Sequence, residues 1–152
     1  MMIQSRPMSQ DDRDRRRQRF ARDFDRAVAR RRAMTLRPYQ GASYAGVISF
    51  KTPFRHQAAA AAVRLRVDYV PDRDVLDLAC LPAYLAMLAG EDRPEIEEVL
   101  ETVAADFSSE VVARFARVSA RLEGEAGFAY VRREVWQPRW KSGDLLGRLP
   151  AD

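Results

Sequence analysis

A single cysteine and a single histidine limit the chemistry that this chain can carry out. Cys80 lies in the segment RLRVDYVPDRDVLDLACLPAYL, residues 64–85, and His56 lies in KTPFRHQ, residues 51–57. One cysteine cannot form an internal disulfide, and one cysteine with one histidine supplies too few ligands for a zinc site. We therefore expect no metal site, and the cysteine usage favours a cytoplasmic location.

Four positions could still take part in binding or catalysis. Cys80 precedes a predicted helix, where a thiol can be activated, but its apolar neighbours are typical of a buried structural cysteine. Asp77 either caps that helix or anchors a ligand through its carboxylate. Arg55 and His56 are either loop residues or part of a ligand-binding site. The residue types alone leave these alternatives open.

The first 37 residues form a basic arm. They carry twelve arginines and five aspartates, a net charge of +7, whereas the whole chain is +4 and residues 38–152 therefore sum to −3. The arm contains a long run without glycine or proline, and Ser9 or Asp11 can cap a helix there. Its apolar residues form one narrow stripe at helical spacing. The stripe consists of Phe20, Phe24, Ala27 and Val28.

This predicted helix has three interpretations. It docks its stripe on the body or on a neighbouring subunit; it binds nucleic acid or an acidic partner; or it lies on a membrane surface. The arginines that would bind phosphates or acidic groups are Arg15, Arg16, Arg17, Arg19, Arg30, Arg31 and Arg32.

The periodicity of the remaining chain predicts four strands and two helices. Alternation of apolar and polar residues predicts the strands, the last two of which form a hairpin, and apolar residues at helical spacing predict the helices. The predicted strands cover residues 44–50, 63–69, 116–122 and 128–136. The predicted helices cover 81–88 and 96–107, and KTPFRHQ is predicted to be a loop.

The resulting order ββααββ is typical of an α+β domain with its helices on one face of an antiparallel sheet. We expect a helical arm over residues 1–37, the domain over 38–135 and an irregular tail over 136–152. No apolar run approaches the roughly 20 residues that span a bilayer, and the N-terminus lacks the apolar core of a secretory signal.

The segment YVPDRDVLDLACLPAYL, residues 69–85, resembles a motif of the tunnelling-fold (T-fold) superfamily. In the NADPH-dependent 7-cyano-7-deazaguanine reductases (QueF-like proteins) of queuosine biosynthesis, a strand ending Tyr-Ile/Val-Pro-Asp precedes a helix start Val-Glu-Ser-x-Ser-Leu-x-x-Tyr-Leu. The resemblance covers roughly residues 44–131 and implies a four-stranded antiparallel sheet in a homo-oligomer. The matching residues are Tyr69, Val70, Pro71, Asp72, Leu81, Tyr84 and Leu85.

The resemblance also implies which positions would carry reductase chemistry. The family's nucleophilic cysteine aligns with Phe54 and its proton-donating aspartate with Ala61, and neither side chain can attack a nitrile or move a proton. We therefore expect no nitrile reductase activity and no cofactor, since NADPH would serve only that activity. The family's purine-anchoring glutamate aligns with Asp77. GTP cyclohydrolase I has a similar motif, but its zinc segment aligns with FRHQ and leaves His56 alone.

Three functional hypotheses follow. The first is a catalytically degenerate relative of these reductases that acts as a structural, assembly or partner-binding protein. The second is a protein or enzyme of nucleobase metabolism that holds a purine- or pterin-like ligand through Asp77. The third is binding of nucleic acid or an acidic partner through the arginine-rich arm.

Overall fold

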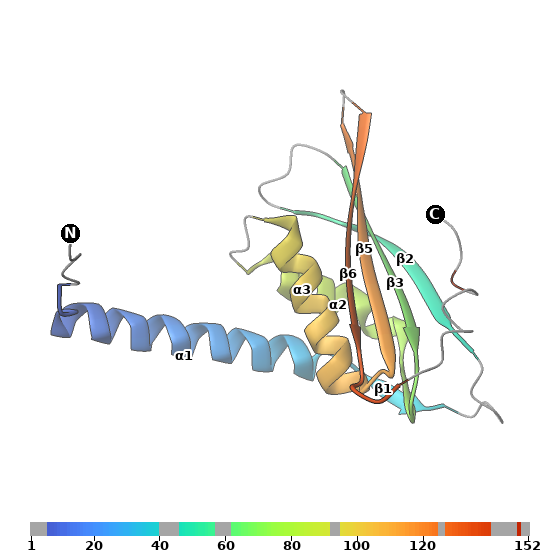
Figure 1. Ribbon diagram of the computed structural model, residues 1–152, viewed down its shortest axis with the longest axis horizontal. Helices are drawn as coiled ribbons and strands as arrows, with labels where there is room; N and C mark the ends of the chain where they lie inside the picture. The colour runs from blue at the N-terminus through green and yellow to red at the C-terminus, as the bar shows by residue number, and fades with distance from the viewer. Residues whose placement is uncertain are drawn as a thin grey trace.

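The computed structural model describes residues 6–39, 46–56, 62–91, 95–124, 127–140 and 149. Its largest element is one antiparallel sheet in the strand order β2-β3-β5-β6. The strands are β2 (Ile48–Phe54), β3 (Ala62–Val70), β5 (Phe115–Gly124) and β6 (Gly127–Trp136). The sheet and the two helices between β3 and β5 in the chain confirm the predicted ββααββ order and the α+β class (Figure 1).

The first strand begins later than predicted: of the predicted range 44–50, residues 48–50 belong to the strand, 46–47 precede it, and 44–45 lie outside the described residues. The strand runs over Ile48–Phe54, so the first four residues of the predicted loop KTPFRHQ belong to it. Pro53 is compatible with this strand because β2 is at the edge of the sheet, where a missing N–H leaves no neighbour unpaired. Phe50 and Phe54 then point to the core, and Lys51 points to the other face.

A second, two-stranded sheet was not predicted. It pairs β1 (Leu36–Pro38) with β4 (Asp74–Leu76), and each strand has only three residues, too few to show a period-2 pattern. The predicted arm boundary at residue 37 lies inside β1. The backbone N–H of Asp77 donates to the carbonyl of Thr35, which adds a further link between the end of the arm and the body.

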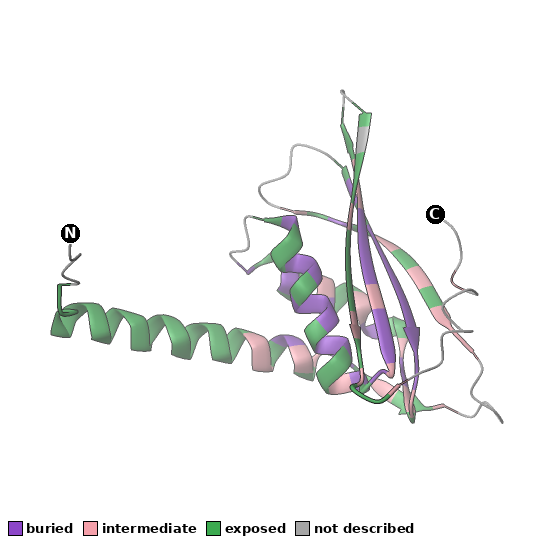
Figure 2. Ribbon diagram, in the orientation of Figure 1, coloured by how far each residue is buried: buried purple, intermediate pink, exposed green. Residues whose placement is uncertain are grey.

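The helices α2 (Leu81–Ala89) and α3 (Ile96–Asp106) cover one face of the sheet (Figure 1). A 3-10 turn, η1 (Leu78–Cys80), precedes α2, and a π-helical turn, η2 (Phe107–Val111), continues α3. Their apolar faces meet the inward side chains of the sheet in one core. Figure 2 colours the buried residues of α3, β3 and β5 purple. The largest fully buried side chains of this core include Leu65, Tyr69, Tyr84, Leu100 and Phe107.

The N-terminal helix α1 (Gln10–Arg32) extends away from this body (Figure 1). The Ser9 hydroxyl accepts a hydrogen bond from the Asp12 N–H at 3.1 Å, which confirms Ser9 as the N-cap. Figure 2 shows that most of α1 is exposed and that burial begins near its C-terminal end. No helix among the described residues has the length and apolarity needed to cross a membrane.

The other face of the sheet carries aromatic side chains near the C-terminal end of β6. Phe115 stacks on Trp136 and on Trp140, with ring centroids 5.7 Å and 5.6 Å apart. Trp136 remains 53% exposed despite this contact.

Candidate functional site

A buried ionic cluster joins α1 to the body. Arg30, near the end of α1, is 2% exposed, and Asp106, the last residue of α3, is wholly buried. The Arg30 guanidinium donates from Nε to Oδ2 of Asp106 at 2.6 Å and from Nη2 to Oδ1 at 3.0 Å. This two-point geometry is the strongest that an arginine and a carboxylate form.

Three more side chains complete the cluster. The Tyr84 hydroxyl of α2 donates to Asp106 Oδ2 at 2.6 Å, and Arg31 Nε donates to Asp106 Oδ1 at 2.9 Å. Glu91, just after α2, accepts a hydrogen bond from Arg30. Among the described residues, two cations thus meet two carboxylates, and one cluster ties α1, α2 and α3 together.

The cluster shifts the pKa of its members in opposite directions. Burial by itself would raise the pKa of Asp106, but hydrogen bonds from Arg30, Tyr84 and Arg31 lower it below its ordinary value. Burial and the neighbouring Asp106 carboxylate raise the pKa of the Tyr84 hydroxyl well above its ordinary value. Burial by itself would lower the pKa of Arg30, but Asp106 and Glu91 raise it overall. Asp106, Tyr84 and Arg30 therefore each keep one charge state near neutral pH.

Two of the seven arm arginines predicted to bind a partner are engaged inside the protein. Arg30 is buried, and Arg31 is half-buried, because both balance the charge of Asp106. Asp106 is 76 residues from Arg30 along the chain, so no local pattern indicated this pairing. The exposed members of the set are Arg15, Arg16, Arg17, Arg19 and Arg32.

The outer part of α1 presents the predicted apolar stripe to solvent. Phe20 is 73% exposed and Phe24 is 59% exposed, whereas Ala27 and Val28 are half-buried. The stripe thus contacts its own body only at its C-terminal end. Within one copy of the chain, α1 therefore exposes two phenylalanines on one face, with arginines around them.

Asp77 and Cys80 have local structural roles. The Asp77 carboxylate accepts a hydrogen bond from the Ala79 N–H at 3.1 Å and so caps η1. Asp77 is half-buried. Cys80 is a buried member of the apolar core, as its neighbours indicated.

Arg55 and His56 lie far from Asp77 within one copy of the chain. Arg55 and His56 follow Phe54, which pairs with Val63 at one end of β3. Asp77 follows β4 near the other end of β3, where the Leu76 N–H donates to the Tyr69 hydroxyl. The six residue steps from Val63 to Tyr69 span about 20 Å along the strand. Arg55 is exposed, and the His56 ring lies 6.3 Å from the Phe54 ring.

Phe54 occupies the core and not an open pocket. Its side chain is 6% exposed and belongs to the main apolar cluster. Ala61, the other position aligned with a catalytic residue, lies outside the described residues.

The cluster residues Asp106, Tyr84 and Glu91 were missed as partners of the arm. Their sequence signal is weak, because Tyr84 and Asp106 lie within helical patterns that predict only packing. A buried carboxylate requires a cation, and the arm supplies more arginines than its aspartates can balance. That imbalance indicated contact with an acidic surface but not which residue would provide it.

Comparison with known proteins supports the fold. No family model matches the chain, and no curated protein matches its sequence. Among solved structures, the archaeosine synthase QueF-Like in its apo form is similar, with 14% sequence identity and a TM-score of 0.53. The match covers 62% of this chain and 95% of that chain. At this identity the match shows the fold alone, and it confirms the resemblance to the tunnelling-fold, QueF-like proteins.

Proposed function

We propose that this protein is a tunnelling-fold relative that acts in assembly, with α1 docking on a neighbouring copy of the chain. The observation that carries this proposal is the exposure of Phe20 and Phe24, 73% and 59%, on a helix whose other end is anchored in the body. Exposing two phenylalanines to water is unfavourable, and covering them contributes roughly 1.5–3 kcal/mol each.

A second copy is the occupant whose charge fits the arm. The arm carries a net charge of +7, and residues 38–152 carry −3. The body also exposes an acidic helix face, formed by Glu97, Glu98 and Glu101 of α3. β2 and β6 are the edge strands of the four-stranded sheet and offer backbone groups for pairing with a neighbouring sheet, and the resemblance noted in the sequence implies a homo-oligomer.

A role in assembly requires no catalytic activity. The buried position of Phe54 in the core supports the expectation that nitrile reductase activity is lost, since that residue aligns with the family's nucleophile. We therefore propose a degenerate enzyme with no NADPH requirement. The local cap formed by Asp77 accounts for that carboxylate without a ligand.

The test is the oligomeric state of a double variant. Phe20→Ser with Phe24→Ser should weaken self-association, lowering the mass measured by analytical ultracentrifugation over a dilution series. Arg22→Gln with Arg26→Gln is the matched control, because these exposed residues lie about 200° around the helix from the phenylalanines. A wild-type protein that stays monomeric, or a phenylalanine variant that assembles like wild type, would exclude the proposal.

Binding of nucleic acid by the arm is a second candidate. Arg6, Arg15, Arg16 and Arg19 line one hollow beside the start of α1, together with the single carboxylate of Asp12. Such a cluster would neutralise several phosphates, so the affinity for a single-stranded oligonucleotide should fall steeply with salt. Replacing Arg15, Arg16 and Arg19 by Gln should reduce the slope of log K against log salt by about 2. An oligonucleotide that binds the variant and the wild type equally would exclude this role.

A further inference from the structure

The sheet face opposite α2 and α3 is basic, although the body as a whole is acidic. Alternation along the four strands assigns six cations and three carboxylates to this face among the described residues, a net charge of +3. Residues 38–152 together carry −3. The cations are Lys51, Arg64, Arg66, Arg117, Arg121 and Arg132, and the carboxylates are Asp68, Glu123 and Glu134.

Two pairs of like charges lie directly opposite each other across neighbouring strands. Arg64 of β3 pairs with Arg121 of β5, and Lys51 of β2 pairs with Arg66 of β3. Like charges in directly opposed positions destabilise a sheet. A sheet that places two such pairs side by side gains stability when an anion binds between them.

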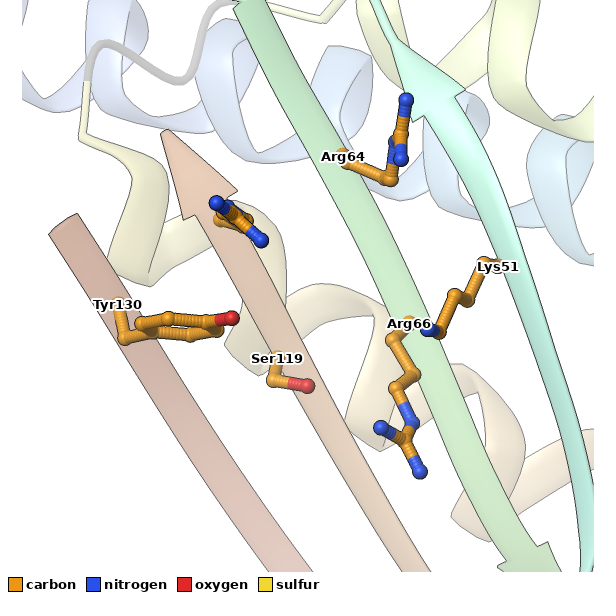
Figure 3. Close-up of a pocket in the computed structure, with 6 residues that line it drawn as sticks. Lys51, Arg64, Arg66, Ser119 and Tyr130 are labelled. Carbon is orange, nitrogen blue, oxygen red and sulfur yellow. The ribbon is translucent and has the colours of Figure 1, made fainter. Parts of the chain in front are cut away.

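These side chains line one pocket with two hydroxyl groups. The pocket has a volume of about 70 Å³, and its lining comprises Lys51, Arg64, Arg66, Ser119, Arg121 and Tyr130. Figure 3 shows Lys51 and Ser119 extending towards Arg66 from its two sides, with Tyr130 on the next strand. A volume several times that needed by one water suits a compact anion.

A buried carboxylate, that of Asp68, holds the pocket residue Arg66 in place. Asp68 is wholly buried and accepts hydrogen bonds from Arg66 Nε at 3.1 Å, from Arg117 Nη2 at 3.2 Å and from the Ser49 hydroxyl at 2.5 Å. Arg66 is itself only 6% exposed. Its guanidinium is therefore fixed before any ligand arrives, which reduces the entropy lost on binding.

β5 and β6 contribute Arg121 and Tyr130 to the pocket lining beside Arg64. Arg121 lies over the Tyr130 ring, with its Cζ atom 5.9 Å from the ring centroid, and its Nε lies 2.8 Å from Oε1 of Glu123. These contacts orient Arg121 across from Arg64. Among the described residues, this pair of arginines lies beside one carboxylate, that of Glu123.

We propose that this pocket binds a phosphate group, either as inorganic phosphate or as the phosphate of a nucleotide. A tetrahedral dianion accepts hydrogen bonds from several directions, and the pocket offers donors from four strands: an ammonium, three guanidinium groups and two hydroxyls. The site is on a different face from α2 and α3 and uses none of the residues by which α1 is anchored. The proposal is thus independent of the assembly role.

The test measures the melting temperature of the full-length protein at constant ionic strength. Inorganic phosphate should raise it along a saturable curve, because a ligand that binds only the folded state stabilises that state. Measuring the Kd of a nucleoside monophosphate in the same way separates the two sources of the phosphate group. A tighter Kd for the nucleotide than for inorganic phosphate indicates a nucleotide, and equal Kd values indicate phosphate itself.

Arg64→Gln is the central variant because Arg64 is exposed and its replacement removes a like-charge contact. It should melt no lower than wild type without ligand and bind phosphate about tenfold more weakly, the loss expected for one charge-assisted hydrogen bond. Lys51→Gln, also exposed, is a second variant with the same expected direction. Arg17→Gln on α1 is the control and should bind as wild type does.

Two results would overturn the proposal. One is a response to phosphate no larger than the response to chloride at the same ionic strength. The other is an unchanged phosphate affinity in both Arg64→Gln and Lys51→Gln, which would place any binding outside this pocket.

Discussion

Asp106 accepts hydrogen bonds from three side chains on two helices other than its own. They are Arg30 and Arg31 of α1 and Tyr84 of α2. Removing one partner of a buried ion pair leaves the other charge buried and uncompensated. The resulting loss in the free energy of unfolding is larger than the net stability that the intact pair provides. Asp106 is therefore the residue on which attachment of the arm depends most.

We expect Asp106→Asn to lower the free energy of unfolding by about 3 kcal/mol, measured by urea denaturation at neutral pH. The exposed Asp25→Asn on α1 is the control and should change the free energy of unfolding by less than about 0.5 kcal/mol. Equal effects of the two substitutions would show that the cluster does not anchor the arm.

The same residue predicts a pH dependence. The folded-state pKa of Asp106 lies below its unfolded value of about 3.9, so its contribution is complete above that pH and is lost as the pH falls through the folded-state pKa. The free energy of unfolding of wild type should therefore fall more steeply below about pH 4 than that of Asp106→Asn.

At the scale of elements, one connection holds a residue in an unfavourable conformation. Val112, between η2 and β5, has φ 52° and ψ 44° in the left-handed region, where a β-branched side chain is strained. Its side chain is 48% exposed, so little apolar contact offsets this cost. The turn must reverse the chain here so that β5 can pair with β3.

Val112→Gly should therefore raise the free energy of unfolding by about 1 kcal/mol, measured by urea denaturation. Val112→Ala removes the same apolar branches but keeps a Cβ, so it should gain clearly less. A loss of stability in the glycine variant would contradict the assignment of strain.

At the scale of the whole molecule, α1 combines a fixed base with an exposed outer part. Residues 10–26 are all exposed, whereas Arg30 is buried in the cluster. A buried ion pair fixes direction, because its hydrogen bonds are satisfied in only one geometry. The protein therefore presents the Phe20–Phe24 stripe in a defined orientation relative to its sheet.

Hydrogen exchange should report how the arm is used. If α1 docks on a neighbouring copy, amides around Phe20 and Phe24 should exchange slowly at high protein concentration and quickly after dilution, while those near Arg30 stay protected in both. In Phe20→Ser with Phe24→Ser, the amides of the outer helix should exchange quickly at every concentration. Concentration-independent exchange in wild type would argue against docking between copies.

The sequence by itself predicted the elements whose signal is local. Period-2 alternation predicted β3, β5 and β6, helical spacing predicted α2 and α3, and the YVPD motif indicated the fold that the solved structure of the QueF-like protein confirms. It misplaced β2, because Pro53 normally excludes a strand and only the sheet order shows that β2 is at an edge.

Only the tertiary structure decided which charges meet. Arg30 reaches Asp106 across 76 residues, and Arg64 lies opposite Arg121 through the strand register. In sequence, Arg30 is one of seven arm arginines predicted to bind a partner, and Arg64 is on the polar side of an alternating strand. Periodicity reports which face of an element is buried, but it carries no information on which distant element covers that face. The anchor of the arm and the basic pocket depend on pairings between distant segments, and these are determined only when the core packs.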